Sequence, residues 1–393
     1  MKNNDLSDPL YLAKALINCP SETPNDAGAI ALLEVALKEL GFNCHLFSFG
    51  NAGEKGRDAL IKNIYAKKGN GNNLCFAGHT DVVPAGPLDK WNFSPFEATI
   101  EKDVLYGRGA SDMKGAIAAF VAATARHFNK NQNTFGISFL ITGDEEGYAI
   151  NGTKAVLKKL NKMEEVISHC IVGEPTNPSK LGETIKIGRR GSLHGKIIVE
   201  GKQGHVAYPN LASNPLPQLA NLVSILSNFR LDEGNKYFQP SNLEFISIDT
   251  GNYTSNLIPL NASANFNVRF NNLYNEKTLV NKLRNILKEN NSDSSLKWKL
   301  ETELSGEPFL TPKDKFVELV SGAVEEVTHL KPELSTSGGT SDARFIKDFC
   351  PVIEFGSVGK TMHQINECIA IDELEKLTEI YEKILLEYGK KYS

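Results

Sequence analysis

The sequence predicts an α/β protein in which a larger domain, split in two along the chain, carries a smaller α+β domain as an insertion. Short apolar runs alternate with helical patterns before residue 188 and again near the end of the chain. Between these parts the order is strand, helix, strand, strand, helix, strand. At 393 residues the chain is also too long for one typical domain. We expect the larger domain at 1–188 and 303–393, and the insertion at 189–302.

The first part of the chain alternates between helices and strands. Residues 25–41 carry apolar positions at helical spacing and end at Gly41. Four apolar runs bounded by Gly, Asn or Asp read as strands: ALIKNIYA, NLCFAGHTDVV, FGISFLIT and HCIVG. A helix is expected at 113–128, with Asp112 as a plausible N-cap. Buried strands that alternate with helices predict a largely parallel sheet.

The inserted segment changes character. Its elements are LHGKIIVEG, NPLPQLANLVSILSNF, LEFISIDTG, ASANFNVRF, EKTLVNKLRNILKEN and SLKWKLETEL, in the order βαββαβ. In ASANFNVRF apolar side chains alternate with Asn265, Asn267 and Arg269, so these polar residues face away from the apolar side. This order predicts a ferredoxin-like unit. Afterwards a helix at 313–328, a strand at PVIEFG and a helix at 372–388 return to the α/β pattern.

Composition excludes several classes of protein. With 43 basic and 47 acidic residues the net charge is −4, which does not suit non-specific nucleic-acid binding. The longest nearly apolar stretch, at 115–125, is too short to span a bilayer, and MKNNDLSDPL lacks the order of a signal peptide. Six scattered cysteines without a CxxC pair favour buried thiols in a reducing compartment. We therefore expect a cytoplasmic protein with neither nucleic-acid nor membrane partners.

Acidic and imidazole side chains stand where the predicted strands end, which is where open α/β sheets bind ligands. Six follow strands, and the seventh starts the helix at 113–128. These residues are His79, Asp81, Asp112, Glu145, Glu146, Glu174 and His363. Each has an ordinary explanation alone, because HxD triplets arise by chance, paired glutamates are usually solvated and an Asp often caps a helix. Gathered at one edge, however, the carboxylates would repel one another unless a cation neutralised them.

The types of side chain indicate which metal this site would bind. Two imidazoles with several carboxylates suit zinc or a similar cation, and a bridging carboxylate favours two ions about 3.5 to 4 Å apart. Such a pair acidifies a water and polarises a carbonyl, which predicts amide hydrolysis. Adjacent glutamates cannot reach one ion from the same backbone direction, so Glu146 is assigned as a ligand and Glu145 as the general base. Asp81 could accept the free N–H of His79.

Seven segments carry a resemblance to a known family. They are GHTDVVP, YGRGASDMKG, TGDEEG, VGEPT, GRRGSLHGKIIVEGKQGHVAYPNLASNP, SGGTSDARF and MHQINE. In this order and spacing they resemble the dinuclear zinc M20 peptidase family from about His79 to Glu367. The resemblance implies a zinc-peptidase-like catalytic domain with two Zn²⁺ ions per subunit, which Co²⁺ can replace.

Site roles follow from the resemblance by position. It implies that Asp112 bridges the two ions and that Glu145 is the acid and base, supported by Asp81 behind the first histidine. One ion is completed by His79 and Glu174, and the other by Glu146 and His363. The inserted domain is implied to form a homodimer and to send His205 into the partner's active site, although the residues alone indicate only a loop histidine.

The segments GRRGS, GKQGHVAYP and GGTSDARF resemble a branch of the family that removes succinate from the small molecule N-succinyl-LL-2,6-diaminopimelate. Its three carboxylates require fixed positive charge, for which arginine is well shaped. The contacts implied by similarity are Arg189, Ser192, Tyr208, Asn256, Arg269, Gly339 and Thr340. Gly359 departs from the pattern, because several relatives have Asn there.

Other functions remain open from the sequence. Within the family, the alternatives are an N-acetylornithine deacetylase, a metallo-aminoacylase or a dipeptidase. Outside it, a catalytically silent metal-stabilised dimer would serve as a binding module, but all five ligands and Glu145 are present. A serine or cysteine hydrolase is disfavoured, since the chain has no GxSxG motif.

Overall fold

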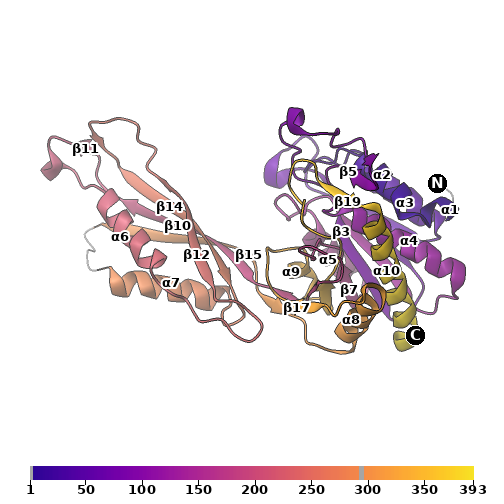
Figure 1. Ribbon diagram of the computed structural model, residues 1–393. Coiled ribbons are helices and arrows are strands. Elements are labelled where there is room, and N and C mark those ends of the chain that lie inside the picture. The colour runs from indigo at the N-terminus through magenta and orange to yellow at the C-terminus, as the bar shows by residue number, and fades with distance from the viewer. Residues whose placement is uncertain (1–2, 292–295) are drawn as a thin grey trace. The chain divides into compact units, whose positions relative to one another are not determined.

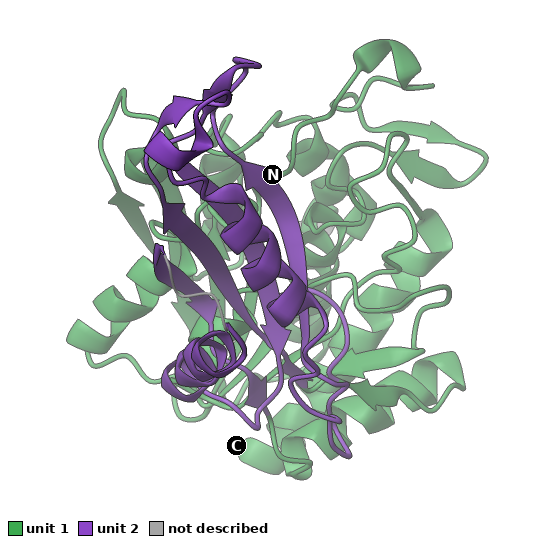
Figure 2. Cartoon of the chain, turned by 90° about the vertical axis from the view of Figure 1, so that its left-hand side faces the viewer, with its two compact units in different colours: residues 1–187, 311–335, 341–393 green, residues 188–310, 336–340 purple. Residues whose placement is uncertain are grey.

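The computed structural model describes residues 3–291 and 296–393, which form two compact units (Figure 2). Unit 1 contains the residues up to 187 together with 311–335 and 341–393, and unit 2 contains 188–310 and 336–340. The predicted boundary after residue 302 is wrong, because it falls inside a strand that pairs along unit 2 as far as Gly306. Sequence patterning also gave no sign that 336–340 returns to unit 2.

Within the described residues, eight strands form the main sheet of unit 1 (Figure 1). In spatial order they are β1 (Asn43–Phe49), β2 (Ile61–Lys68), β6 (Gly136–Thr142), β3 (Asn73–His79), β7 (His169–Val172), β18 (Val352–Glu354), β8 (Thr184–Lys186) and β17 (Glu333–Ser335). Pairing is parallel from β6 through β3 and β7 to β18, and antiparallel in the β1-β2-β6 part and between β18 and β8. The sheet is therefore mixed, with a parallel centre where the sequence predicted a largely parallel sheet.

Helices cover this sheet and bury its apolar strands. Their bounds are α1 (Asn3–Leu6), α2 (Pro9–Ile17), α3 (Ala29–Glu39), α4 (Lys114–Lys130), α5 (Thr153–Lys162), α8 (Lys315–Thr328), α9 (Ala343–Ile346) and α10 (Ile371–Tyr392). Helix α4 packs against α2 and α10, and α10 packs against α8. Phe120 of α4 stacks on Phe76 of β3 with ring centroids 4.5 Å apart, and Tyr381 of α10 packs on both. These aromatic contacts fix α4, and hence the turn before it, over the ends of the central strands.

A small antiparallel sheet brings together two loops that lie far apart in the sequence. Strand β5 (Val104–Tyr106) pairs with β4 (Thr99–Glu101) on one side and with β19 (Cys368–Ala370) on the other. As a result, the segment that leads into α4 runs beside the segment that follows His363.

Unit 2 has the predicted βαββαβ order over its described residues. Its antiparallel sheet has the order β12 (Asn242–Asp249), β14 (Asn261–Phe270), β10 (Gly191–Glu200) and β15 (Lys297–Gly306), with helices α6 (Leu216–Ser227) and α7 (Glu276–Asn290). Short pairs join β9 (Gly188–Arg189) to β16 (Phe309–Leu310) and β11 (Gly204–His205) to β13 (Leu257–Ile258). The alternation predicted for β14 is present, since Phe266 and Val268 are buried while Asn267 and Arg269 are partly exposed. The buried face packs on Leu222 of α6 and on α7.

Two further observations bear on the expectations from composition. None of the helices in the described part of the chain has the length and apolar character needed to cross a membrane. All six cysteines, each of which is described, are free thiols.

Candidate metal centre

The parallel strands of unit 1 deliver their polar residues to one place. Strand β3 ends at His79, and Glu174 stands two residues beyond the end of β7. His79 Nε2 lies 3.3 Å from Asp112 Oδ1 and 3.8 Å from Glu174 Oε1. These three side chains therefore converge although their positions span almost a hundred residues, as expected for carboxyl ends of neighbouring parallel strands.

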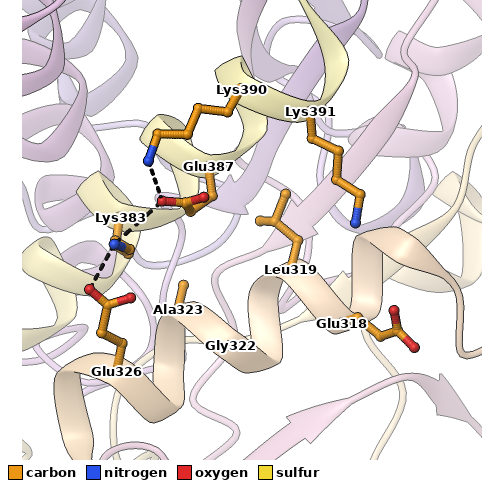
Figure 3. Close-up of a pocket in the computed structure, with 9 residues that line it drawn as sticks. All are labelled: Glu318, Leu319, Gly322, Ala323, Glu326, Lys383, Glu387, Lys390 and Lys391. Carbon is orange, nitrogen blue, oxygen red and sulfur yellow. Dashed lines mark hydrogen bonds and ion pairs between the residues drawn. The ribbon is translucent and has the colours of Figure 1, made fainter.

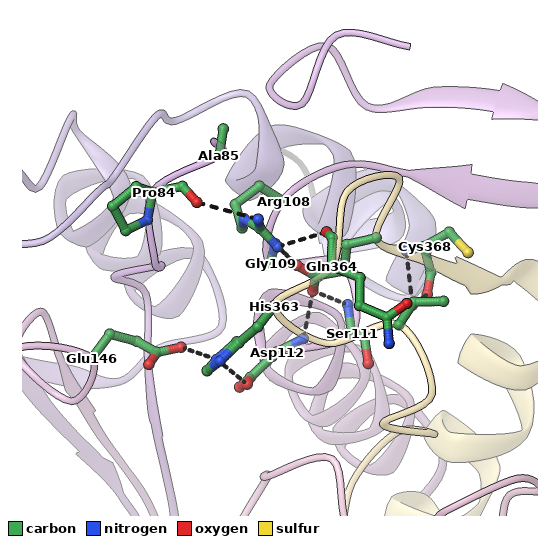
Figure 4. A network of polar contacts seen from close by, with 12 residues as sticks. Pro84, Ala85, Arg108, Gly109, Ser111, Asp112, Glu146, His363, Gln364 and Cys368 are labelled. Carbon is green, nitrogen blue, oxygen red and sulfur yellow. Dashed lines mark hydrogen bonds and ion pairs between the residues drawn. The ribbon is translucent and has the colours of Figure 1, made fainter. Parts of the chain in front are cut away.

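The other carboxylate oxygen of Asp112 faces a second imidazole. His363 Nε2 lies 3.2 Å from Asp112 Oδ2 and 2.8 Å from Glu146 Oε1 (Figure 4). Asp112 thus stands between His79 and His363 with one oxygen toward each ring. A carboxylate in this position can bridge two cations.

The donor atoms fit a pair of divalent cations. Among the described residues, three groups place their ligand atoms within 4.8 Å of one another: His79 with Asp112 and Glu174, Asp112 with Glu146 and His363, and His79 with Glu145 and Glu146. His79 Nε2 and Asp112 Oδ1 are buried and make no well-aligned hydrogen bond, so their polarity calls for another partner. Mixed imidazole and carboxylate donors are a ligand set that zinc accepts.

In the metal-free chain, several pKa values in this cluster are shifted far from their usual values. Burial raises the pKa of Glu145 well above its usual value, and the negative charge of Glu174 raises it further. Contacts with Asp112 and Glu146 raise the pKa of His363 to about 10. For Asp112, burial alone would raise the pKa, but the close contacts with the His363 and His79 rings hold it below the usual range. The neighbouring carboxylates therefore favour positive charge on His363, and the partly buried Glu145 favours its protonated form.

The structure corrects the expected role of the Asp81 side chain. His79 Nδ1 contacts the backbone carbonyl of Asp81 at 2.8 Å, whereas the nearest carboxylate oxygen is 3.7 Å away. The carboxylate instead accepts hydrogen bonds from the backbone N–H groups of Glu145, at 3.2 Å, and Glu146, at 3.0 Å. The backbone of Asp81 thus orients the imidazole and leaves Nε2 for a metal, while its side chain fixes the loop that carries the two glutamates.

The suggestion that Asp112 caps a helix is also wrong. Met113 occupies the N-cap position of α4, with no side-chain cap hydrogen bond, and the Asp112 carboxylate points to the two histidines. The backbone N–H of Asp112 donates to the carboxylate of Glu367. Asp112 is therefore held by its backbone, which leaves both carboxylate oxygens for the cluster.

Arg108 and Glu367 were missed by the sequence reasoning. The buried Glu367 carboxylate accepts from the N–H groups of Gly109, Ser111 and Asp112, and Arg108 Nη1 donates to it at 2.8 Å. Arg108 also donates to the carbonyls of Gln364 and Pro84 (Figure 4). Both residues lie inside segments that carried the resemblance, YGRGASDMKG and MHQINE, but nothing in their spacing shows that they pair.

The implied substrate contacts of unit 2 fall into two groups. Ser192 of β10 pairs in register with Arg269 of β14, and Arg189 donates to the carbonyl of Ser337 beside the segment that carries Gly339 and Thr340. A second group surrounds β11. There the rings of His205 and Tyr208 lie 5.8 Å apart, and Val206 N–H donates to the carbonyl of Asn256.

These two groups lie toward opposite ends of β10. Arg189 precedes the strand and His205 follows it. A strand of this length spans about 33 Å at roughly 3.3 Å per residue. Within unit 2, the structure therefore does not bring His205, Tyr208 and Asn256 together with the arginines.

Gly359 packs closely against the loop that follows Glu174. Its N–H donates to the carbonyl of Asn177, and a Cβ at this position would lie 3.0 Å from the carbonyl oxygen of Pro175. A side chain here needs a small backbone shift, so the present backbone suits glycine.

Two of the hollows among the described residues of unit 1 differ in their relation to the site. One, of about 430 Å³, lies between α8 and α10, where Lys383 pairs with Glu326 and Lys390 pairs with Glu387 (Figure 3). It contains none of the predicted site residues. The other, of about 240 Å³, opens beside Glu146 and is lined in part by Thr23, Pro84 and Tyr148.

Comparison with known proteins adds a family and a set of relatives. The model of peptidase family M20/M25/M40 matches residues 75–387. The succinyl-diaminopimelate desuccinylase of Ehrlichia chaffeensis is 49% identical over 383 residues, which cover 97% of this chain and 98% of that protein. The protein of the same name from Maricaulis maris is 49% identical over 391 residues, with 99% and 98% covered.

Solved structures share the fold at low sequence identity. The M20 family metallo-carboxypeptidase Sso-CP2 from Sulfolobus solfataricus matches with a TM-score of 0.78 at 20% identity, covering 97% of this chain and 99% of its own. A tripeptidase from Staphylococcus aureus matches with a TM-score of 0.78 at 17% identity over the whole of both chains. A dinuclear metal binding peptidase from Bacillus subtilis matches with a TM-score of 0.71 at 13% identity, covering 98% and 99%. They confirm the expected α/β peptidase fold.

Proposed function

Because this chain belongs to peptidase family M20/M25/M40, we propose that it is a metal-dependent amidohydrolase that converts N-succinyl-LL-2,6-diaminopimelate and water to succinate and LL-2,6-diaminopimelate. This is a step in lysine and diaminopimelate biosynthesis. The near-full-length relatives named for this reaction support the substrate. The observation that carries the chemistry is Asp112, placed with one oxygen toward His79 and the other toward His363.

Two Zn²⁺ ions are the proposed cofactors, with Co²⁺ able to replace them. His79, Asp112 and Glu174 would hold one ion, and Asp112, Glu146 and His363 the other. When bound, such a pair supplies an acidified water and polarises the amide carbonyl.

Glu145 is the proposed general base and acid. It takes a proton from the attacking water as the oxygen–carbon bond forms, and delivers it to the nitrogen as the carbon–nitrogen bond breaks. Two features support this role. Its backbone N–H is fixed by Asp81, and burial favours the protonated state from which the proton is delivered.

Substrate recognition is assigned to unit 2. The substrate carries three carboxylates, and Arg189 and Arg269 supply guanidinium groups suited to them. Ser192, Gly339 and Thr340, which are smaller residues near these arginines, would add further polar contacts.

A homodimer accounts for the remaining predicted contacts. His205, Tyr208 and Asn256 lie at the other end of β10 from Arg189, so they would serve the active site of a partner subunit. Strand β12 lies at the edge of its sheet and exposes Ile246 and Ile248, whose side chains are 66% and 59% exposed. An exposed apolar edge strand is suited to pairing with a second copy.

We also propose a cytoplasmic location, because the cysteines are free thiols and the proposed reaction is biosynthetic.

The purified, zinc-loaded chain should be assayed on the succinyl substrate and on N-acetylornithine side by side. We expect faster turnover of the succinyl substrate, loss of activity after chelation, and recovery on addition of Zn²⁺ or Co²⁺. Faster turnover of N-acetylornithine would instead identify a deacetylase of the same family. Light scattering of the same sample tests the dimer.

A further inference from the structure

A loop near the N-terminus braces the segment that follows β3. The Ser21 hydroxyl donates to the carbonyl of Thr80 at 2.6 Å, and the N–H of Val82 donates to the carbonyl of Ser21 at 3.0 Å. The N–H of Thr23 donates to the carbonyl of Val82 at 3.2 Å. The loop at 21–23 is thus tied to the chain on both sides of Asp81.

Thr23 makes a further contact that reaches the carboxylate of Asp81. Its hydroxyl donates to Asp81 Oδ2 at 2.7 Å, which is shorter than the bonds that the same carboxylate accepts from the N–H groups of Glu145 and Glu146. The Asp81 side chain is 1% exposed, so water has little access to replace a lost donor. The carboxylate therefore joins the 21–23 loop to the loop that carries both glutamates.

Thr23 also packs against that second loop directly. A Cβ added at Gly147 would lie 2.7 Å from the methyl carbon of Thr23, so the chain just after Glu146 passes close to it. The same threonine lines the hollow beside Glu146. The hydroxyl of Thr23 thus acts on the glutamate loop through Asp81, whereas its methyl packs against that loop directly.

We propose that Thr23 is a positioning residue for the metal centre, whose hydroxyl holds the Asp81 carboxylate in the orientation that fixes Glu145 and Glu146. The inference rests on the proposed function for the roles of these two glutamates. Thr23 acts through Asp81 and is not assigned a contact with metal or substrate. When the hydroxyl is removed, Asp81 loses its side-chain donor and can rotate, so the backbone of both glutamates is released.

The test separates this role from simple stabilisation with three variants. Thr23→Val keeps the shape and removes the hydroxyl, whereas Thr23→Ser keeps the hydroxyl and removes the methyl. Ser21→Ala is the matched control, because it removes a buried hydroxyl bond of the same loop that does not involve the Asp81 carboxylate. Each is measured for zinc affinity by titrating the metal-free chain against a chromogenic chelator, for kcat and KM of the zinc-saturated enzyme, and for thermal midpoint.

For Thr23→Val we expect kcat to fall about 10- to 100-fold and the weaker zinc to bind about 10-fold or more less tightly, as for other residues that orient ligands. KM should change little, since the assigned substrate contacts lie in unit 2. Thr23→Ser should restore most of both losses. Ser21→Ala should lower the thermal midpoint as much as Thr23→Val while leaving kcat and zinc affinity near the parent values.

Parent-like kcat and zinc affinity in Thr23→Val would overturn the proposal. Equal losses of kcat in Thr23→Val and Ser21→Ala would do the same, because they would show a general effect of loop stability. The zinc titration uses no substrate. It therefore judges Thr23 separately from the succinyl assay, which judges the proposed function.

Discussion

The two halves of the metal cluster are built in different ways. His79 ends a central strand and is 1% exposed, and its Nδ1 is held by the backbone of Asp81. His363 lies in a loop, its side chain is 49% exposed, and its backbone has a φ of 60°. Left-handed backbone is uncommon for a residue other than glycine, so surrounding contacts must hold it. Burial in the sheet therefore positions the half that contains His79, whereas hydrogen bonds between loops position the half that contains His363.

Glu367 provides those loop bonds. It stands four residues after His363, and its carboxylate binds three N–H groups of the segment that leads to Asp112 as well as Arg108. The loop with His363 is thereby tied to the backbone that leads to Asp112 rather than to the sheet. This difference can be tested half by half.

The largest expected effect comes from removing each histidine. His79→Ala should abolish measurable activity and prevent tight binding of both ions, because the buried half loses its imidazole and Asp112 loses the buried one of its two histidine partners. In the metal-free chain, burial lowers the pKa of His79 but Asp112 and Glu174 raise it well above its usual value, so the ring is a cation. Its removal should therefore also cost about 3 kcal/mol of unfolding free energy, since the buried carboxylates lose a paired charge. His363→Ala should retain one ion per chain. Elemental analysis after gel filtration and denaturant unfolding measure both variants, and equal metal loss in the two would contradict the comparison.

Glu145→Gln should lower kcat by about 10²- to 10⁴-fold, the range for loss of a general base, without changing the metal content of either half. Gln keeps the size of the side chain but cannot take up the proton. Steady-state kinetics and elemental analysis on one preparation measure the two effects. If an ion is lost as well, Glu145 acts as a ligand, as its place in one of the candidate ligand groups allows.

Glu367→Gln should weaken the half that contains His363. An amide has one acceptor oxygen for the N–H groups that the carboxylate now binds, so zinc affinity should fall about 10- to 100-fold at that half and change little at the other. Glu373→Gln is a matched control, because the Glu373 carboxylate binds the N–H of Val358 and none of the three N–H groups leading to Asp112. Stepwise titration with a chelator resolves the ions. A loss shared equally by both halves would show that Glu367 supports the whole site.

The smallest effect is a pH dependence of the metal-free chain. The pKa of His363 rises from 6.5 to about 10 on folding, so its contribution to stability is fully present below pH 6.5 and is lost as the pH rises toward 10. The thermal midpoint should therefore fall over this range by more in the parent than in His363→Ala. Half exposure keeps the difference modest, because solvent screens the charges. Parallel curves for the two proteins would remove His363 from this dependence.

Local sequence predicts those features of the fold and site that depend on burial and on chain direction. Apolar runs give the strands, and the carboxyl ends of parallel strands share an edge, so the gathering of His79, Glu146 and Glu174 could be predicted. The βαββαβ order of unit 2 followed from periodicity in the same way. The family likewise followed from short segments whose residues and order are specific.

Contacts between distant segments were decided by the tertiary structure alone. The Arg108 and Glu367 pair is separated by 259 positions, and the place of 336–340 in unit 2 depends on neighbours from elsewhere in the chain. The carboxylate of Asp81 turned from the expected imidazole to two backbone N–H groups, and Asp112 bridges two histidines instead of capping α4. Periodicity and spacing record which face of an element is buried. They do not record which hydrogen-bond donor a buried carboxylate meets, because that depends on how the packed segments finally lie side by side.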